Sequence, residues 1–148
     1  MKELVINNHY GGFSLSHRGI LRYAELTGLT LYPRIDDIDK RVRPDVTFDN
    51  AFFVHYYTVP VDEFNRQADE DRKRGDFAKS SELYFNDHGI PRDDINLIRV
   101  VKELGEKSWG KCAQLAIVAI PDDVEWEIEE YDGWEHVAEK HRVWYAED

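Results

Sequence analysis

The run from Cys112 to Ile120, CAQLAIVAI, is apolar on both of its alternating faces. A strand with one solvated face alternates apolar and polar residues, whereas a strand covered on both faces reads as a continuous apolar run. The run therefore predicts a strand near the centre of a sheet. Cys112, at the start of this run, is expected to be buried and unreactive.

The stretch from Val124 to Tyr131 alternates strictly between apolar and acidic residues in its first half. Because successive side chains of a strand point to opposite faces, we expect Trp126 and Ile128 to face a core and the glutamates between them to face solvent. This pattern is typical of a half-buried strand.

After this strand, the dipeptide Asp132-Gly133 is compatible with two structures. In the first, it forms a type I′ turn, which its residue types favour. The chain would then return as a second strand of a hairpin, pairing Glu125 with Lys140 and Glu129 with His136.

In the second structure, Asp132 caps a helix and Glu135 completes a capping box. Large side chains and alanine then recur at helical spacing, at Trp134, Val137, Ala138, His141, Trp144 and Tyr145. The length of this match favours the helix over the hairpin.

The rest of the chain alternates between signals for strands, helices and turns. The expected elements are a strand at Lys2–Asn7, a helix between Ser16 and Gly28, a surface loop at Asp36–Asn50, an aromatic strand at Ala51–Val59 and a helix from Asp93 to Gly105. The sequence therefore predicts a single α+β domain over residues 1–148. Its mixed or antiparallel sheet has about five strands, with three or more helices packed on it.

Negative charge is concentrated at the C-terminal end. From Pro121 to Asp148, acidic residues greatly outnumber the two basic residues, Lys140 and Arg142, and the whole chain has a formal net charge of −11. The same segment is rich in tryptophan, and disordered acidic tails are poor in aromatic residues. We therefore expect a folded acidic surface that selects basic partners and repels nucleic acid.

Neither a membrane span nor a secretion signal is visible in the sequence. No apolar run approaches the roughly 18 residues that cross a membrane, and the N-terminus lacks the apolar stretch of a signal peptide. Cys112 is the only cysteine, which rules out an internal disulfide and favours a reducing compartment. The expected protein is cytoplasmic and binds neither membranes nor nucleic acid directly.

The acidic end is the first candidate binding site, for a host protein. Carboxylates at alternate positions of a strand share one face, so they form a row that a basic partner can bind. The expected partner-binding residues are Glu125, Glu127, Glu129, Glu130, Tyr131, Asp132 and Glu135. The alternative is the ordinary solvated face of an antiparallel sheet.

The Gly11-Gly12 loop is the second candidate, for a small anionic ligand such as a nucleotide. Free backbone N–H groups at the start of a helix, next to glycines that permit close approach, hold anions. The expected ligand-binding residues are His9, Tyr10, Gly11, Gly12, Phe13, Ser14, Ser16 and Arg92. The alternative is a tight turn that requires two glycines, with Arg92 in a salt bridge at the start of a helix.

Motifs for catalysis and for metal binding are missing from the sequence. HExxH, CxxC and DxDxDG do not occur, and neither Ser14 nor Ser16 lies in a GxSxG elbow. The sequence thus predicts no catalytic residue, no metal and no cofactor. An unrecognised enzyme ranks third, behind the two kinds of binding protein.

Three stretches occur in a distinctive order: VINNHYGGFSLS, IPRDDINLIRVVKELGEKSWGK and IPDDVEWEIEEYDGWEHVAEKHRVW. Over about half of its length, the chain resembles a family of small accessory proteins of tailed bacteriophages and prophages. The resemblance implies a protein that acts in the cytoplasm of an infected bacterium, where such proteins often bind and disable host components. It implies no catalytic residue, because no activity is established for the family.

Overall fold

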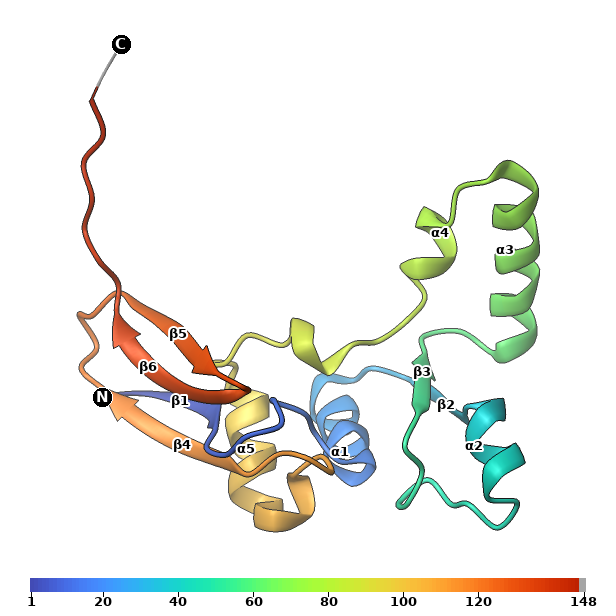
Figure 1. The fold of residues 1–148 in the computed structure, drawn as a ribbon, viewed down its shortest axis with the longest axis horizontal. Helices are drawn as coiled ribbons and strands as arrows, with labels where there is room; N and C mark the ends of the chain where they lie inside the picture. Colours follow the sequence, from blue (N-terminus) through green and yellow to red (C-terminus); the bar gives the residue numbers. More distant parts are fainter. Residues whose placement is uncertain (147–148) are drawn as a thin grey trace.

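The computed structural model describes residues 1–146 and has an α+β fold (Figure 1). Its strands are β1 (Lys2–Asn7), β2 (Tyr32–Ile35), β3 (Val54–Tyr57), β4 (Leu115–Ile120), β5 (Trp126–Tyr131) and β6 (Trp134–Glu139). Its α-helices are α1 (His17–Thr27), α2 (Asp37–Val42), α3 (Val61–Arg74), α4 (Ala78–Ser81) and α5 (Ile95–Leu104). Two acidic residues of the C-terminal segment, Glu147 and Asp148, lie outside the described residues.

The strands form three two-stranded antiparallel sheets, where the sequence predicted about five strands in one sheet. β4 pairs with β1 and with no other described strand, and Val5 lies opposite Ile117. Both of these residues contact the main core, while Leu4, on the opposite face of β1, is also buried. The strand that is buried on both faces is therefore β1, whereas β4 beyond Leu115 is half-buried or, at Ala119, exposed. The prediction of a central strand at this run is wrong, because β4 is one of two strands in its sheet. Helix α5 contacts both strands, and β6 contacts β1 without pairing with it.

The start of the apolar run differs from the prediction. β4 begins only at Leu115, and Cys112 is exposed in the preceding turn instead of buried in a strand. Gly11 lies so close to Cys112 that a Cβ atom on Gly11 would approach the Cys112 carbonyl oxygen to 2.6 Å. The thiol thus lies at the surface beside the Gly11-Gly12 loop.

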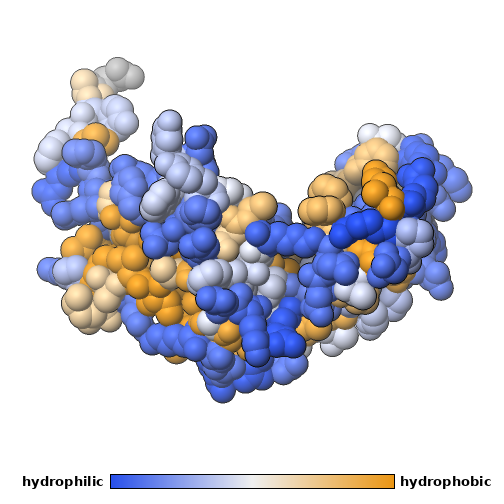
Figure 2. Space-filling model, turned by 60° about the horizontal axis from the view of Figure 1, so that its bottom comes forward, coloured by the Kyte–Doolittle hydropathy of each residue, from blue (hydrophilic) through white to orange (hydrophobic). Residues whose placement is uncertain are grey.

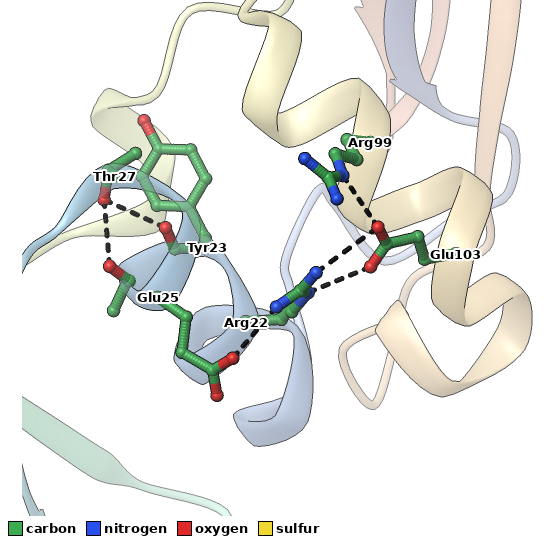
Figure 3. A network of polar contacts seen from close by, with 7 residues as sticks. Arg22, Tyr23, Glu25, Thr27, Arg99 and Glu103 are labelled. Carbon is green, nitrogen blue, oxygen red and sulfur yellow. Dashed lines mark hydrogen bonds and ion pairs between the residues drawn. The ribbon is translucent and has the colours of Figure 1, made fainter.

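Helix α1 forms as its end signals predict. The Ser16 side chain accepts a hydrogen bond from the Gly19 N–H at 3.0 Å, and Gly28 ends the helix with φ of 72°. α1 packs against α5, and Figure 3 shows the ion pairs on the outside of this contact. Arg22 of α1 and Arg99 of α5 both bind the Glu103 carboxylate, at 2.9 and 2.7 Å.

The segment between α1 and α5 lies to one side of the β1–β4 sheet and contains β2, β3, α2, α3 and α4 (Figure 1). Helix α2 occupies part of the predicted surface loop. Asp36 caps it, and Asp39, its third residue, accepts a hydrogen bond from the Phe53 N–H at 2.6 Å. The predicted aromatic strand is shorter than expected, so Phe53 precedes β3.

Figure 2 shows apolar residues gathered at both ends of one face of the molecule.

The C-terminal helix favoured by the sequence is absent from the described residues, and the hairpin forms in its place. Asp132 and Gly133 have φ values of 49° and 83°, as a type I′ turn requires. Glu129 pairs with His136, and the Lys140 N–H donates to the Glu125 carbonyl at 2.9 Å. The helix prediction placed Glu135 in a capping box, whereas Glu135 is buried in the hairpin and paired with Arg92.

Trp126 and Ile128 lie on the hairpin face that also holds Glu135, since they alternate with Glu127 and Glu129 along β5. The two faces of β5 are divided as predicted, but Trp126 and Ile128 are only half-buried, as is Glu127, and neither apolar residue belongs to the main core. Trp134, expected in the interior, is 41% exposed.

Candidate functional site

A cleft of about 560 Å³ lies between the Gly11–His17 segment and the segment from Phe48 to Tyr56. The first wall consists of the loop after β1 and the start of α1, and the second consists of the loop that leads into β3. The aromatic side chains that line the cleft are Phe13, Phe48, Phe52, Phe53, Tyr56 and Trp109. We use "the cleft" for this site below.

His17 and Tyr56 join the two walls through a hydrogen bond of 2.8 Å between Nδ1 and the phenol oxygen. Phe48 stacks on His17, with ring centroids 4.7 Å apart and an angle of 10° between the rings. Burial lowers the pKa of His17, although Asp49 acts to raise it. Burial also raises the pKa of Tyr56, as do the charges of Asp87 and Asp49, so both rings are uncharged at neutral pH.

Asp87 is the less exposed of the two carboxylates that line the cleft. Its side chain accepts a hydrogen bond from the Leu15 N–H at 2.8 Å, just before helix α1. The His88 imidazole is 3.8 Å from the same carboxylate. Asp87 therefore fixes the loop from Gly12 to Ser16 against the chain that precedes α5.

Lys111 contacts the wall that leads into β3. Its ammonium group donates to the Asn50 carbonyl and lies 4.0 Å from the centroid of the Phe52 ring. The Arg43 guanidinium lies 4.6 Å from the same ring. Phe52 is 66% exposed despite these two contacts, so part of its surface is open to solvent.

The structure brings most of the predicted ligand loop to this cleft. Gly11, Gly12, Phe13, Ser14 and Ser16 line it, whereas His9, Tyr10 and Arg92 are not among its lining residues. Arg92, considered as an exposed anion contact, is instead bound by the Glu135 carboxylate. Five of the eight predicted ligand-binding residues thus line the cleft, and their binding of a ligand stays a prediction.

The sequence did not identify the second wall of the cleft, nor several polar residues around it. His17, Tyr56, Asp87 and Lys111 were missed because none belongs to a motif, and most of them are far apart in the chain. One usable signal was present: the aromatic stretch around Phe52 follows Asp49 and Asn50, which are residues typical of turns. Such a stretch indicates aromatic side chains on a loop.

The two predicted binding sites meet on the outer side of the Gly11-Gly12 loop. The Gly11 N–H donates to the Asp132 carbonyl at 3.0 Å, and a Cβ atom on Gly133 would lie 2.2 Å from the Gly12 nitrogen. The Tyr10 ring is edge-on to Trp134, with centroids 4.9 Å apart. The two glycine turns therefore pack backbone to backbone, which leaves no room for side chains.

The acidic surface is smaller than the sequence predicted. Glu125, Glu129, Glu130, Tyr131 and Asp132 are exposed, and Glu127 is half-buried. Glu135 is 5% exposed and paired with Arg92, so it is not part of this surface. His136 lies 3.2 Å from Glu129, and the backbone of Lys140 pairs with that of Glu125, so a histidine and a lysine lie beside the row of carboxylates.

The chemistry of the cleft is that of a binding site with an aromatic body and a few polar groups. Across residues 1–146, no group of three or more His, Cys, Asp or Glu side chains is arranged to hold a metal ion. None of the helices that the structure describes is long and apolar enough to cross a membrane. Comparisons with protein families, with curated protein sequences and with solved structures give no match for this chain.

Proposed function

We propose that this protein binds a small organic molecule in the cleft and does not transform it. The observation that supports this proposal is the composition of the cleft: aromatic rings from both walls surround a volume of about 560 Å³. Small-molecule sites typically enclose roughly 300–1,000 Å³ and combine apolar walls with a few polar groups. His17 and Tyr56 are the polar groups that would orient such a ligand.

The polar groups of the cleft are partly used in contacts within the protein. Nδ1 of the His17 imidazole is hydrogen-bonded to Tyr56, and burial keeps that phenol protonated by raising its pKa. The Asp87 carboxylate accepts the Leu15 N–H. Nε2 of His17 has no hydrogen-bond partner among residues 1–146, so it is the nitrogen that can contact a ligand.

The test uses Cys112, which lines the cleft and is the only cysteine of the chain. A panel of small aromatic and aliphatic fragments is screened at millimolar concentration for two effects: slower alkylation of Cys112 and a higher melting temperature. A ligand at 100 times its Kd stabilises the fold by about 2.7 kcal/mol. The proposal fails if no fragment produces either effect.

Two variants show whether a hit occupies the cleft. Tyr56→Phe removes the hydroxyl group that contacts His17, so we expect it to weaken binding of hits that use this pair. Tyr84→Phe is the matched control, because Tyr84 does not line the cleft. Equal loss of binding in both variants would place the hits elsewhere on the protein.

The exposed part of the acidic surface supports a second candidate function, binding of a host protein. Its carboxylates lie beside Tyr131, which is 73% exposed, and beside the pair of Tyr10 and Trp134. Exposed aromatic residues within a charged rim are typical of protein interfaces. In the phage setting that the sequence resemblance implies, the partner would be a basic protein of the host cytoplasm.

Charge reversal tests this second function. Changing Glu125, Glu129 and Glu130 to Lys should abolish capture of a specific partner from host lysate, and salt should weaken capture by the unmodified protein. The control makes the same change of charge on α3, at Asp62, Glu63 and Glu70, which are exposed. Retention of the same partners by the hairpin variant would remove this candidate.

A further inference from the structure

We propose that the ligand of the cleft is an organic cation, such as a quaternary or protonated alkylammonium compound. The inference rests on the proposed function and specifies the chemical class of the ligand. What points to it is the juxtaposition of aromatic rings, two of which already bind cationic side chains, with the carboxylates of Asp49 and Asp87.

Two aromatic rings of the cleft already contact cationic side chains of the protein. The Arg92 guanidinium lies 3.7 Å from the centroid of Phe13, and Lys111 and Arg43 lie near Phe52. The face of an aromatic ring carries partial negative charge, so it attracts cations, and quaternary ammonium groups are held in cages of such rings. Phe53 lines the same cleft and is 60% exposed, so its ring surface is open to a ligand.

The carboxylates of the cleft also favour a cation and outnumber the one lysine. Asp49 and Asp87 are the carboxylates that line the cleft, and Lys111 is the single lysine. The pKa of Tyr56 is raised partly by these two carboxylates, which indicates a negative field between the walls. The net charge of −11 on the whole chain adds to this field and favours the approach of cations.

An anionic ligand is disfavoured because three N–H groups of the loop, those of Gly11, Leu15 and Ser16, already have acceptors within the protein. The acceptors are the Asp132 carbonyl for Gly11, the Asp87 carboxylate for Leu15 and the Ser108 carbonyl for Ser16. The Ser16 hydroxyl oxygen accepts a hydrogen bond from the Gly19 N–H. The anion expected at this loop is therefore supplied by the protein, as the side chain of Asp87.

The experiment compares two molecules of the same shape that differ in charge: choline and its uncharged isostere 3,3-dimethylbutan-1-ol. Binding to the intact protein is measured by NMR titration and by protection of Cys112 from alkylation. We expect choline to bind at least tenfold more tightly than the isostere. AMP serves as the anionic probe and should bind more weakly than both.

Three variants attribute the preference to the cleft. Asp49→Asn, at an exposed position, should lower the affinity for choline several-fold and leave the affinity for the isostere unchanged. Asp87→Asn keeps an oxygen that can accept from Leu15 and should act in the same way. Lys111→Met removes the cation near Phe52 and should raise the affinity for choline. Asp62→Asn, on α3, is the control and should change neither.

The possible failures are distinguishable. Equal affinity for choline and the isostere, or tighter binding of AMP, would overturn the cationic class and leave a ligand-binding cleft. Loss of choline binding in Asp62→Asn to the same extent as in Asp49→Asn would show nonspecific attraction by the acidic protein and would also overturn it. If choline, 3,3-dimethylbutan-1-ol and every neutral fragment fail to protect Cys112 from alkylation, the proposed function fails together with the inference.

Discussion

Arg92 and Glu135 form a buried bidentate ion pair, with nitrogen–oxygen distances of 2.6 and 2.8 Å. Arg92 also donates to the Val5 carbonyl and lies over the Phe13 ring, while Glu135 accepts the Asn7 N–H at 2.7 Å. The pair thus joins the C-terminal hairpin to β1 and to the chain before α5. The hairpin is held on the molecule by charge as well as by apolar contact.

Breaking this pair should destabilise the protein strongly. Replacing Glu135 with Gln leaves the Arg92 guanidinium buried without its counter-charge, and loss of one partner of a buried pair typically costs about 3–5 kcal/mol. Glu130→Gln is the matched control, because Glu130 lies opposite Glu135 in the hairpin but is exposed. Urea unfolding of both variants measures the difference. A Glu135→Gln variant as stable as Glu130→Gln would contradict the role of the pair.

A methyl group at Gly133 should separate the hairpin turn from the Gly11-Gly12 loop. In Gly133→Ala the new Cβ would meet the backbone of Gly12 at 2.2 Å, and backbone atoms cannot move aside as a flexible side chain does. Gly28→Ala is the control, since Gly28 also has a positive φ, 72°, but nothing lies within 4 Å of its Cβ position.

The control variant isolates the cost of a left-handed alanine, about 1–2 kcal/mol. Gly133→Ala should lose clearly more free energy of unfolding than Gly28→Ala, and the NMR signals of Tyr10 and Trp134 should shift with it. Equal losses in the two variants would show that the close approach of the two turns does not contribute to stability.

Local signals were sufficient to predict the elements whose ends are fixed by their own residues. Ser16 and Gly28 define α1 through contacts within a few residues. Asp132-Gly133 was compatible with the hairpin turn that forms, but also with the helix that the sequence favoured. The same signals could not choose between hairpin and helix. That choice depends on Arg92, which binds Glu135 from 43 residues away.

The cleft was predictable on one wall and not on the other. The Gly11-Gly12 loop carries a recognisable turn signal, so its place at a site follows from the sequence. The opposite wall comes from residues such as Tyr56 and Lys111, which the fold brings together from distant segments. The prediction that Cys112 is buried was wrong, because it assumed that the strand begins at the first residue of the apolar run.

Asp71 should make the α3–α4 pair sensitive to acid. Burial acts to raise the pKa of this carboxyl, but hydrogen bonds from Ser80, Gln67 and Arg74 outweigh burial and lower the pKa to about 2 from an ordinary value of 3.8. Because the folded pKa is the lower one, the stabilisation is complete above pH 3.8 and is lost as the pH falls towards about 2.

The measurement is amide exchange at Ser80, whose N–H donates to Asp71 at 2.7 Å. Protection of Ser80 should fall between these two pH values in the unmodified protein. It should be low and nearly independent of pH in Asp71→Asn. Asp69→Asn is the control, because that carboxylate is exposed on the same helix and pairs only with Arg72 in the described residues. Loss of the pH dependence in Asp69→Asn as well would argue against Asp71 as its source.

Two tryptophans distinguish the observed hairpin from the helix that the spacing favoured. Trp126 is half-buried on the hairpin face that holds Glu135, so Trp126→Ala should cost roughly 2 kcal/mol, less than the ~3–5 kcal/mol of a fully buried tryptophan. Trp144 follows the hairpin and is 80% exposed, so Trp144→Ala should change the free energy of unfolding by less than about 0.5 kcal/mol. If this segment formed a helix with Trp134 and Trp144 on its inner side, Trp144→Ala would lose as much free energy of unfolding as Trp126→Ala, or more. Urea unfolding of the two variants therefore decides between the structures, and a large loss in Trp144→Ala would contradict the hairpin arrangement.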